Sequence, residues 1–270
     1  MSSKKITSFY RGIQLYSSEV AVLQEIEELL SQPIPSGGIA FYKTGFAYQN
    51  KHVVGLSLHK KRLTNLPDSI QALTHLEHLY LRDNRLLNLP SVIGNLSNLK
   101  NLDIFNNHIT YLPERIGNLH QLRRFDLSRN FIPALPQNIG SLQSLERLGL
   151  LNVQLESIPD SIGQLTNLWD FIASTNQLTS IPETFCKLTN LRRLILHNNK
   201  LKALPEEIGR LSALEVLSVH SNKLSRLPPS ITKLISLKVL RLEKNSIHRL
   251  APEFEDWLRF LKSKGCSIRF

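Results

Sequence analysis

The sequence predicts an α/β solenoid whose concave face is a curved, right-handed parallel β-sheet and whose convex side is irregular, 3-10 or short helical. Two observations predict it: a motif that recurs every 23 residues, and the alternation of leucines within each copy. The motif is Leu76-x-x-Leu79-x-Leu81-x-x-Asn84-x-Leu86, and no insertion interrupts its spacing. The nine copies start at Val53, Leu76, Leu99, Leu122, Leu145, Leu168, Leu191, Leu214 and Leu237.

Each part of the repeat predicts one element. Leucines at alternating positions are typical of a short half-buried strand, and successive strands should stack in parallel about 4.8 Å apart. A Leu-Pro or Ile-Pro pair, such as Leu112-Pro113, then turns the chain toward the convex side, where proline has no ladder donor to lose. An Ile-Gly pair such as Ile116-Gly117 usually follows. One repeat cannot bury its own apolar face, so the stack should fold as a unit.

The asparagine that follows each strand is expected to be buried and hydrogen-bonded to the backbone of the neighbouring turn, because a buried amide is tolerated only when it is paired. These residues form a predicted structural ladder: Asn84, Asn107, Asn130, Asn176, Asn199, Asn222 and Asn245. Two copies break the ladder, with Lys61 in the first repeat and Val153 in the fifth. The break at Val153 indicates either a locally looser loop or a hinge in the middle of the solenoid.

These nine in-phase copies, with their Leu-Pro and Ile-Gly pairs, resemble the leucine-rich repeat family. Within that family they are similar to the 23-residue subclass of intracellular Ras-group proteins. The resemblance covers roughly 210 of the 270 residues. It implies a leucine-rich repeat solenoid, and it suggests a small GTPase or another signalling protein as one class of partner.

The solenoid is expected to carry a helical cap at each end, because its open ends need cover. Residues 1–12 are predicted to form a flexible tail and residues 13–52 an N-terminal cap of a helix plus a hairpin. The apolar spacing predicts the helix over Glu19–Leu30, with Ser18 as its N-cap.

Two apolar segments, Ile39–Tyr42 and Phe46–Tyr48, should lead as a hairpin into the first strand of the nine repeats, which span 53–250. Residues 251–270 are predicted to be a capping helix that begins at Pro252, followed by a terminal strand. Both ends are read as complete, which favours a whole protein over a fragment.

Composition and charge narrow the function classes. Lys and Arg outnumber Asp and Glu by 33 to 22, giving a net charge of +11 and a pI near 9.8. No apolar run is long enough for a membrane span, and the polar, basic N-terminus has no secretory signal. The two cysteines match no metal or redox spacing. The cysteine usage favours the cytoplasm. We expect a monomer.

Strand parity places positions three, five and seven of each repeat on the concave surface, facing solvent. Leu151, Ile172 and Ile195 should be exposed and adjacent there, with arginines around them. An apolar centre with arginine and aromatic neighbours is the usual composition of a protein-binding hot spot. The candidate partner-binding residues are Tyr80, Arg82, Phe105, Arg124, Asp126, Arg147, Leu151, Ile172, Arg193, Ile195, His197 and His220.

Two clusters on the concave face contain residue types that can act in acid–base catalysis or bind a metal ion. Asp103 and Asp126 should stack about 5 Å apart, but acid–base catalysis needs a cleft that an open sheet does not provide. His197, His220 and Glu243 share a column, yet a metal site usually has four ligands with supporting contacts. We therefore predict no enzyme activity, no metal and no cofactor.

The sequence thus favours a non-catalytic scaffold that binds a folded protein on the concave face of repeats four to seven. One alternative is a structural or engineered, consensus-like scaffold without a specific partner. Another is binding to an anionic surface or nucleic acid through Arg62, Arg85, Lys200 and Lys223 along one edge. Nucleic acid is disfavoured because the concave columns are nearly neutral, whereas a nucleic-acid groove carries one sign of charge.

Overall fold

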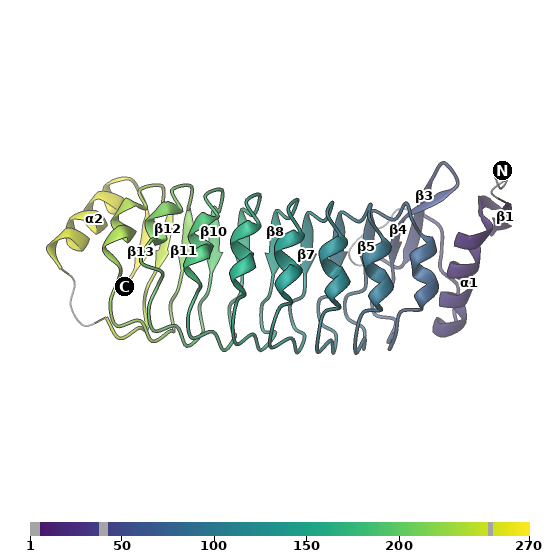
Figure 1. Cartoon of the computed structure of the whole chain (residues 1–270), viewed down its shortest axis with the longest axis horizontal. Helices are drawn as coiled ribbons and strands as arrows, with labels where there is room; N and C mark the ends of the chain where they lie inside the picture. The colour runs from purple at the N-terminus through teal and green to yellow at the C-terminus, as the bar shows by residue number, and fades with distance from the viewer. Residues whose placement is uncertain (1–5, 38–42, 248–250) are drawn as a thin grey trace.

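The computed structural model describes residues 6–37, 43–247 and 251–270, and the α/β solenoid is confirmed (Figure 1). The strands are β1 (Thr7–Tyr10), β2 (Ile13–Tyr16), β3 (Gly45–Gln49), β4 (His52–Ser57), β5 (His78–Tyr80), β6 (Asn101–Asp103), β7 (Arg124–Asp126), β8 (Arg147–Gly149), β9 (Asp170–Ile172), β10 (Arg193–Ile195), β11 (Val216–Ser218), β12 (Val239–Arg241) and β13 (Ser267–Arg269). Eleven of them, β3 to β13, form one sheet in sequence order.

Short 3-10 helices form a row on the side of the solenoid opposite the sheet (Figure 1). They are η1 (Asp68–Ala72), η2 (Ser91–Asn95), η3 (Glu114–Asn118), η4 (Gln137–Ser141), η5 (Asp160–Gln164), η6 (Glu183–Lys187), η7 (Ile208–Arg210) and η8 (Pro229–Lys233). An α-helix lies near each end of the row: α1 (Ser17–Leu30) and α2 (Pro252–Ser263). Between the two layers the repeat leucines and isoleucines form one continuous core.

The sheet keeps the 23-residue period in its register. Strands β4 to β12 pair in parallel, and every residue faces its equivalent in the next repeat, as in Ile172 beside Ile195. After each strand the chain turns through a residue with a left-handed backbone. This residue is always the eighth of the repeat: Lys60, Asp83, Asn106, Arg129, Asn152, Thr175, Asn198, Ser221 and Lys244. We call these turns, at positions eight to thirteen of each repeat, the trailing rim.

The asparagine ladder forms as the sequence predicts. Asn130 is representative: its Nδ2 donates hydrogen bonds to the carbonyl oxygens of Leu127 (2.8 Å) and of Ile104 in the preceding repeat (2.9 Å). Its Oδ1 accepts one from the backbone N–H of Ile109 (3.0 Å). One buried amide thus satisfies three backbone groups in two adjacent repeats, which ties the repeats together along the trailing rim.

The two repeats without a ladder asparagine differ from the others in the backbone conformation of the turn. Only these two place the tenth residue of the described turns in the left-handed region, Arg62 at φ 57° and Gln154 at φ 63°. In the fifth repeat the carbonyl of Val153 accepts the N–H of Ile132 at 2.7 Å, in place of an asparagine Oδ1. Val153 N–H in turn donates to Asn176 Oδ1 (3.0 Å). Hydrogen bonding therefore continues across the break, and nothing in these contacts marks a hinge.

The Ile-Gly pairs have a packing role on the convex side. A Cβ on the glycine would lie less than 3.0 Å from a backbone carbonyl oxygen of the next repeat, and real Cβ atoms do not approach so closely. The five glycines concerned are Gly94, Gly117, Gly140, Gly163 and Gly209. Their missing side chains let successive 3-10 helices pack at the close spacing that the sheet imposes on the other face.

The N-terminal end differs from the sequence prediction. Residues 7–10, expected within the flexible tail over 1–12, form β1, which pairs antiparallel with β2. The helix begins at Ser17, so Ser18 is not its N-cap; the residue before the helix is Tyr16. Because the hairpin runs directly into α1, the N–H of Ser17 donates to the carbonyl of Ile6 (3.0 Å) instead of to a capping side chain.

The strand that enters the first repeat is part of a hairpin. β3 pairs antiparallel with β4, and Asn50 and Lys51 at the turn both have left-handed backbones, the geometry of a tight two-residue turn. The expected first segment, Ile39–Tyr42, lies outside the described residues. At the other end α2 buries Phe254, Trp257 and Leu261, and β13 pairs in parallel with β12.

No helix in the described parts of the chain combines the length and apolar character that crossing a bilayer requires.

Candidate functional site

The concave face is hollowed over β5 to β9. The hollow has a volume of about 450 Å³ and an apolar floor with charged side chains around it. It is lined by Tyr80, Arg82, Asn101, Leu102, Asp103, Phe105, Arg124, Phe125, Asp126, Ser128, Arg147, Leu148, Gly149, Leu151, Asp170 and Ile172. We call this the concave hollow. It is centred on repeats two to six, nearer the N-terminus than the sequence analysis placed it.

Most of the candidate residues share this hollow. Eight lie in its lining: Tyr80, Arg82, Phe105, Arg124, Asp126, Arg147, Leu151 and Ile172. The other four, Arg193, Ile195, His197 and His220, are not among its lining residues. Asp103 and Asp170 also line the hollow, although neither was predicted as a partner-binding residue; strand parity places both on the concave columns.

Several side chains of the concave columns are less exposed than the sequence predicts. Leu151, Ile172 and Ile195 are only half-exposed, and Tyr80 is buried. Strands about 4.8 Å apart leave little room between neighbouring side chains, so long ones lie over short ones. The apolar floor is therefore a recessed surface between arginines.

Asp170 is the most deeply buried charge of the concave face, with 1% of its surface exposed. Arg147 Nε and Arg193 Nη1 donate to the same oxygen, Asp170 Oδ2, at 3.1 and 3.2 Å. Oδ1 of Asp170 has no hydrogen-bond partner among the described residues. Because a buried carboxylate is costly without cations, these two arginines hold a structural ion triad across β8, β9 and β10.

Phe105 lies beneath two arginines at the N-terminal end of the hollow. The guanidinium of Arg82 lies 4.3 Å from the centre of its ring, and that of Arg129 lies 5.3 Å away. Arg82 also approaches Asp103 Oδ2 at 3.6 Å. These contacts fix an aromatic face and two cations in one orientation, which is a preorganised surface for a partner.

Gly149 makes room for a carboxylate. A Cβ at this position would lie 2.7 Å from Asp126 Oδ1 and 3.2 Å from Ser128 Oγ. Asp126 Oδ1 also accepts the N–H of Ser128 at 3.0 Å. The missing side chain therefore allows Asp126 to lean across the adjacent strand, and it deepens the hollow beside Ile172.

Asp103 is a buried carboxyl with a perturbed proton affinity. Burial raises its pKa to about 6, and the neighbouring Asp126 on β7 adds to the rise, whereas the N–H of Phe105 (2.9 Å) and Arg82 oppose it. A folded-state pKa above the unfolded value near 3.9 means that the native state binds the proton more tightly. Its stabilising contribution is present below pH 4 and is lost as pH rises through 6.

We expect Asp103→Asn to stabilise the protein at neutral pH, because the variant no longer carries a buried charge there. The free energy of unfolding of the variant relative to wild type should rise by about 2 kcal/mol between pH 4 and pH 7. Urea denaturation at several pH values measures it. Asp160→Asn, at an exposed position of η5, is the control and should show no such trend; a flat difference for Asp103→Asn would contradict the assignment.

The histidine column does not have the geometry of a metal site. The rings of His197 and His220 are stacked with centroids 4.5 Å apart and 14° between planes. Imidazole lone pairs lie in the ring plane, so two parallel stacked rings cannot both direct them at one ion. Burial lowers the pKa of both histidines, which favours the neutral stacked pair at neutral pH.

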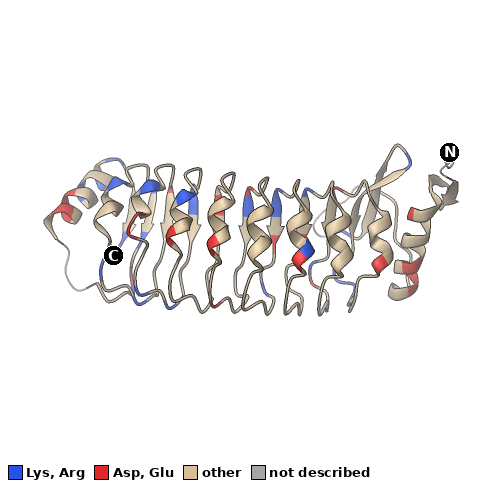
Figure 2. Ribbon diagram, in the orientation of Figure 1, with Lys and Arg blue, Asp and Glu red and all other residues tan. Residues whose placement is uncertain are grey.

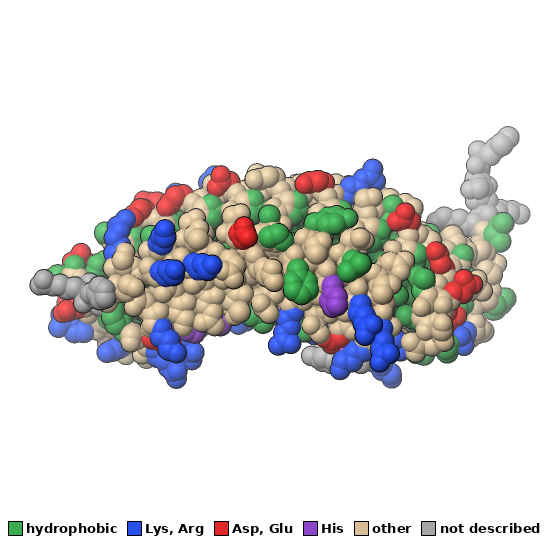
Figure 3. Space-filling view, turned by 90° about the horizontal axis from the view of Figure 1, so that it is seen from below, with side chains coloured by type: hydrophobic (Ala, Val, Ile, Leu, Met, Phe, Trp, Pro, Cys, Tyr) green, Lys and Arg blue, Asp and Glu red, His purple; other side chains and the backbone are tan. Residues whose placement is uncertain are grey.

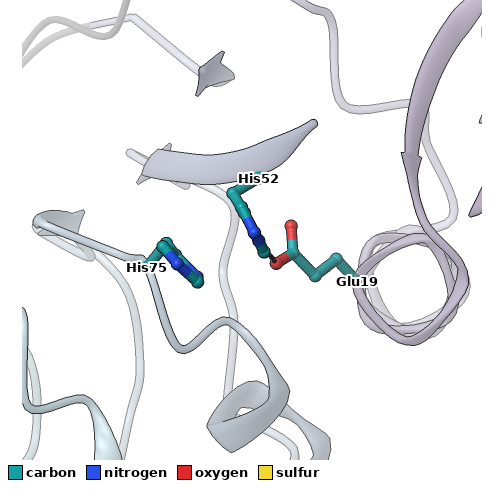
Figure 4. A group of neighbouring side chains, drawn as sticks. All are labelled: Glu19, His52 and His75. Carbon is teal, nitrogen blue, oxygen red and sulfur yellow. Dashed lines mark hydrogen bonds and ion pairs between the residues drawn. The ribbon is translucent and has the colours of Figure 1, made fainter. Parts of the chain in front are cut away.

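A second cluster joins α1 to β4 and to the turn that ends the first repeat: Glu19, His52 and His75 (Figure 4). Glu19 is buried; one carboxylate oxygen lies 2.7 Å from His52 Nδ1 and the other accepts the N–H of Val53 at 2.6 Å. The ring of His52 stacks on that of His75, with centroids 3.4 Å apart. The same lone-pair argument opposes joint coordination of an ion. The contacts instead anchor the helix to the solenoid.

The turns that precede the strands form the opposite edge, which we call the leading rim. Its second-position residues pair across neighbouring repeats: Lys100 with Glu77 at 2.7 Å and Lys238 with Glu215 at 2.7 Å. Trp169 interrupts this charged row beside a hollow of about 680 Å³, and Arg147 lies 5.3 Å from its ring. Trp169 was not predicted as a site residue because it stands at position two of its repeat, outside the concave columns and the basic edge.

Acidic and basic residues both occur on the convex helices, whereas basic residues predominate elsewhere on the solenoid (Figure 2). Several 3-10 helices carry an acid in their first turn, such as Asp68, Glu114 and Glu183. Many of the basic residues lie on the strands and rims. The convex side is thus more acidic than the chain's net charge suggests.

A family model described as a leucine-rich repeat region matches residues 106–194 and 174–263, which together make up more than half of the chain. A second model, the leucine-rich repeat, matches residues 75–96. These matches identify a family and do not distinguish the 23-residue Ras-group subclass. No curated protein shows significant similarity to the chain.

Solved structures with this architecture include a leucine-rich repeat protein from Leptospira interrogans, 34% identical with a TM-score of 0.62. The plant peptide hormone receptor RGFR1 in complex with RGF2 is 32% identical, with a TM-score of 0.63. The ectodomain of the Arabidopsis thaliana receptor kinase GASSHO1/SCHENGEN3, in complex with Casparian strip integrity factor 2, is 29% identical, with a TM-score of 0.69.

The matches cover 75%, 70% and 78% of the present chain, respectively. The chain in turn spans 57% of the Leptospira chain and 31% and 30% of the two plant receptor chains. It therefore corresponds to only part of each of these chains.

Proposed function

Because the chain belongs to the leucine-rich repeat family, we propose that it is a non-catalytic scaffold that binds a folded protein through the concave hollow. The observation that carries this proposal is the recessed apolar floor around Ile172, set among arginines and aromatic residues. That composition is typical of the centre of a protein interface. The two plant receptors, which are solved in complexes, support the same use of the fold.

The internal pairing of the hollow supports binding of a protein over binding of nucleic acid. Asp170 neutralises part of the charge of Arg147 and Arg193, and Asp103 lies beside Arg82. Arg124 is exposed and takes part in no ion pair among the described residues. The surface thus offers a mixed pattern of charge around an apolar centre, which suits a protein partner with its own acids and apolar side chains.

We extend the proposal to a small GTPase or another signalling protein as the partner, in the cytoplasm. The likeness of the repeats to the Ras-group subclass supports this choice. Both cysteines are free and buried, and burial raises the pKa of Cys186 to about 12, so neither thiol is poised for disulfide exchange. This chemistry is compatible with a reducing compartment.

We expect Ile172→Glu and Arg124→Glu each to weaken partner binding about thirtyfold, the effect of losing a hot-spot contact. A photo-crosslinking side chain at position 172 captures the partner from native extract, and titration calorimetry then gives the affinity of each variant. Arg147→Glu is unsuitable for this test, because it would place a second carboxylate beside Asp170 and damage the fold.

The matched controls are Ile235→Glu on the leading rim and Arg115→Glu on η3, both exposed. These variants should bind like wild type. Equal binding by the concave variants and the controls would remove the concave hollow as the site. A crosslinker at position 172 that captures no protein would favour the alternative of a structural scaffold without a specific partner.

A further inference from the structure

The trailing rim carries most of the chain's excess positive charge. Its described residues include ten cations and two acids, against a net charge of +11 for the whole chain. The cations are Lys60, Lys61, Arg62, Arg85, Arg129, Lys200, Lys202, Lys223, Arg226 and Lys244; the acids are Asp83 and Glu156. The residues that carry this charge are not part of the repeat motif, so the motif does not impose it.

Most of these cations have no acidic partner. Arg62, Arg85, Lys200 and Lys223 are exposed, and among the described residues none of the four takes part in an ion pair. On the leading rim, by contrast, cations such as Lys100 are paired with glutamates of the adjacent repeat. The trailing rim therefore presents uncompensated positive charge, which attracts an anionic surface.

An apolar cluster lies between the two groups of cations. Leu87, Tyr111 and Phe131 of repeats two to four are 58%, 56% and 46% exposed, and all three lie on turns of the trailing rim. The ring of His108 lies 6.1 Å from that of Phe131 in an edge-to-face arrangement. Figure 3 views the molecule from the side of the trailing rim and shows hydrophobic side chains gathered between two groups of Lys and Arg.

The rim is a regular row of projecting turns. Each repeat contributes its turn at the same position, and no insertion lengthens any of them. The turns therefore end at a common level along the lower side of the solenoid (Figure 1). The sheet bends the solenoid toward its concave face. This bend leaves the ends of the trailing-rim turns in one plane. Such an edge matches a flat partner.

We propose that the trailing rim docks onto the surface of an anionic phospholipid bilayer. Lys and Arg would face the lipid phosphates, and Leu87, Tyr111 and Phe131 would enter the interface between headgroups and acyl chains. Aromatic rings and aliphatic tips on projecting turns suit that interface, and basic side chains near an anionic leaflet add to the attraction. A single-stranded nucleic acid would instead need aromatic faces spaced along the whole rim.

This orientation leaves the concave hollow free. The sheet runs from one rim to the other, so a solenoid docked through its trailing rim holds its concave face roughly perpendicular to the membrane plane. Lipid and protein would then bind to different surfaces at the same time. The docking inference does not rest on the proposed protein partner, and each can fail without the other.

The test is co-sedimentation of the full chain with vesicles of phosphatidylcholine alone and of equal parts phosphatidylcholine and phosphatidylserine. We expect binding only to the anionic vesicles. Arg62→Gln/Arg85→Gln should lower the partition coefficient about 25-fold, since each basic residue contributes about fivefold. Tyr111→Ser/Phe131→Ser should lower it about tenfold at unchanged charge. In Phe131→Trp, fluorescence should shift to the blue on binding, which reports entry of the side chain into the bilayer.

Two control variants match the changes in charge and apolar surface elsewhere. Lys187→Gln/Lys233→Gln alters two exposed cations on the convex helices, and Ile235→Ser removes an exposed apolar residue from the leading rim. Both should bind vesicles within twofold of wild type. Ile172→Glu should also bind vesicles normally, which separates this test from that of the concave hollow.

Three outcomes would overturn the proposal. The first is an equal loss of binding in the Arg62/Arg85 and Lys187/Lys233 variants, because overall charge would then suffice. The second is binding that depends on charge without any emission shift in Phe131→Trp. The third is an absence of vesicle binding together with rim-dependent binding of polyglutamate or of a DNA oligonucleotide, which would assign the rim to an acidic macromolecule.

Discussion

Replacing Arg147 and Arg193 together with methionine is expected to lower the free energy of unfolding by about 4 kcal/mol. Both arginines donate to Asp170 Oδ2, and that carboxylate is almost completely buried. Methionine keeps most of the volume of each side chain, so Asp170 stays covered but loses both cations. Breaking a buried ion pair from one side is costly because the remaining charge has neither water nor a partner. Urea denaturation measures the change.

The control for this prediction is Arg115→Met/Arg192→Met, which alters two exposed arginines by the same chemistry. It should change stability by less than about 0.5 kcal/mol. Adding Asp170→Asn to the Arg147/Arg193 variant should recover part of the loss, because the buried charge is then removed. A loss no larger than that of the control, or no recovery with Asp170→Asn, would show that the triad is not a structural unit.

Asn130→Ala is expected to lower the free energy of unfolding by about 3 kcal/mol. The substitution leaves the carbonyl oxygens of Ile104 and Leu127 and the N–H of Ile109 without their partner in a buried turn. Thermal and urea unfolding of wild type and variant measure the difference.

Asn118→Ala, at an exposed position of η3, provides the matched control and should be nearly neutral. The fifth repeat offers a second comparison, because its turn already bonds through the carbonyl of Val153. If Asn130→Ala proved as mild as the control, the turn of the fourth repeat could adopt that backbone solution. The ladder amide would then be dispensable in a single repeat.

The repeat architecture was predictable because it depends on spacing alone. A fixed 23-residue interval sets the register of every strand, and alternation along each strand assigns its faces. The asparagine ladder was predictable from the same 23-residue interval, because a polar residue at a buried position has to be hydrogen-bonded. The stacking of Asp103 against Asp126 in the sheet was predicted for the same reason.

The depth of the concave hollow was not predictable from the 23-residue interval. Parity shows that Tyr80 and Asp170 face the concave side, yet both are buried because neighbouring long side chains cover them. The arrangement of such side chains depends on packing between repeats and not on position within one repeat. The apolar cluster around Phe131 was not predicted because it lies on turns, and on that edge only the basic residues were predicted to bind a partner.

Because no insertion interrupts the 23-residue period, distances along the solenoid are multiples of the advance per repeat. Each repeat advances the stack by about 4.8 Å, so Arg85 and Lys200, five repeats apart, are separated by about 24 Å along the rim. Removing one whole repeat would shorten that distance by one step while keeping every other side chain on its face. Deleting or adding 23-residue repeats between two contact sites therefore changes their separation in steps of about 4.8 Å, which can be used to measure the length of a bound partner.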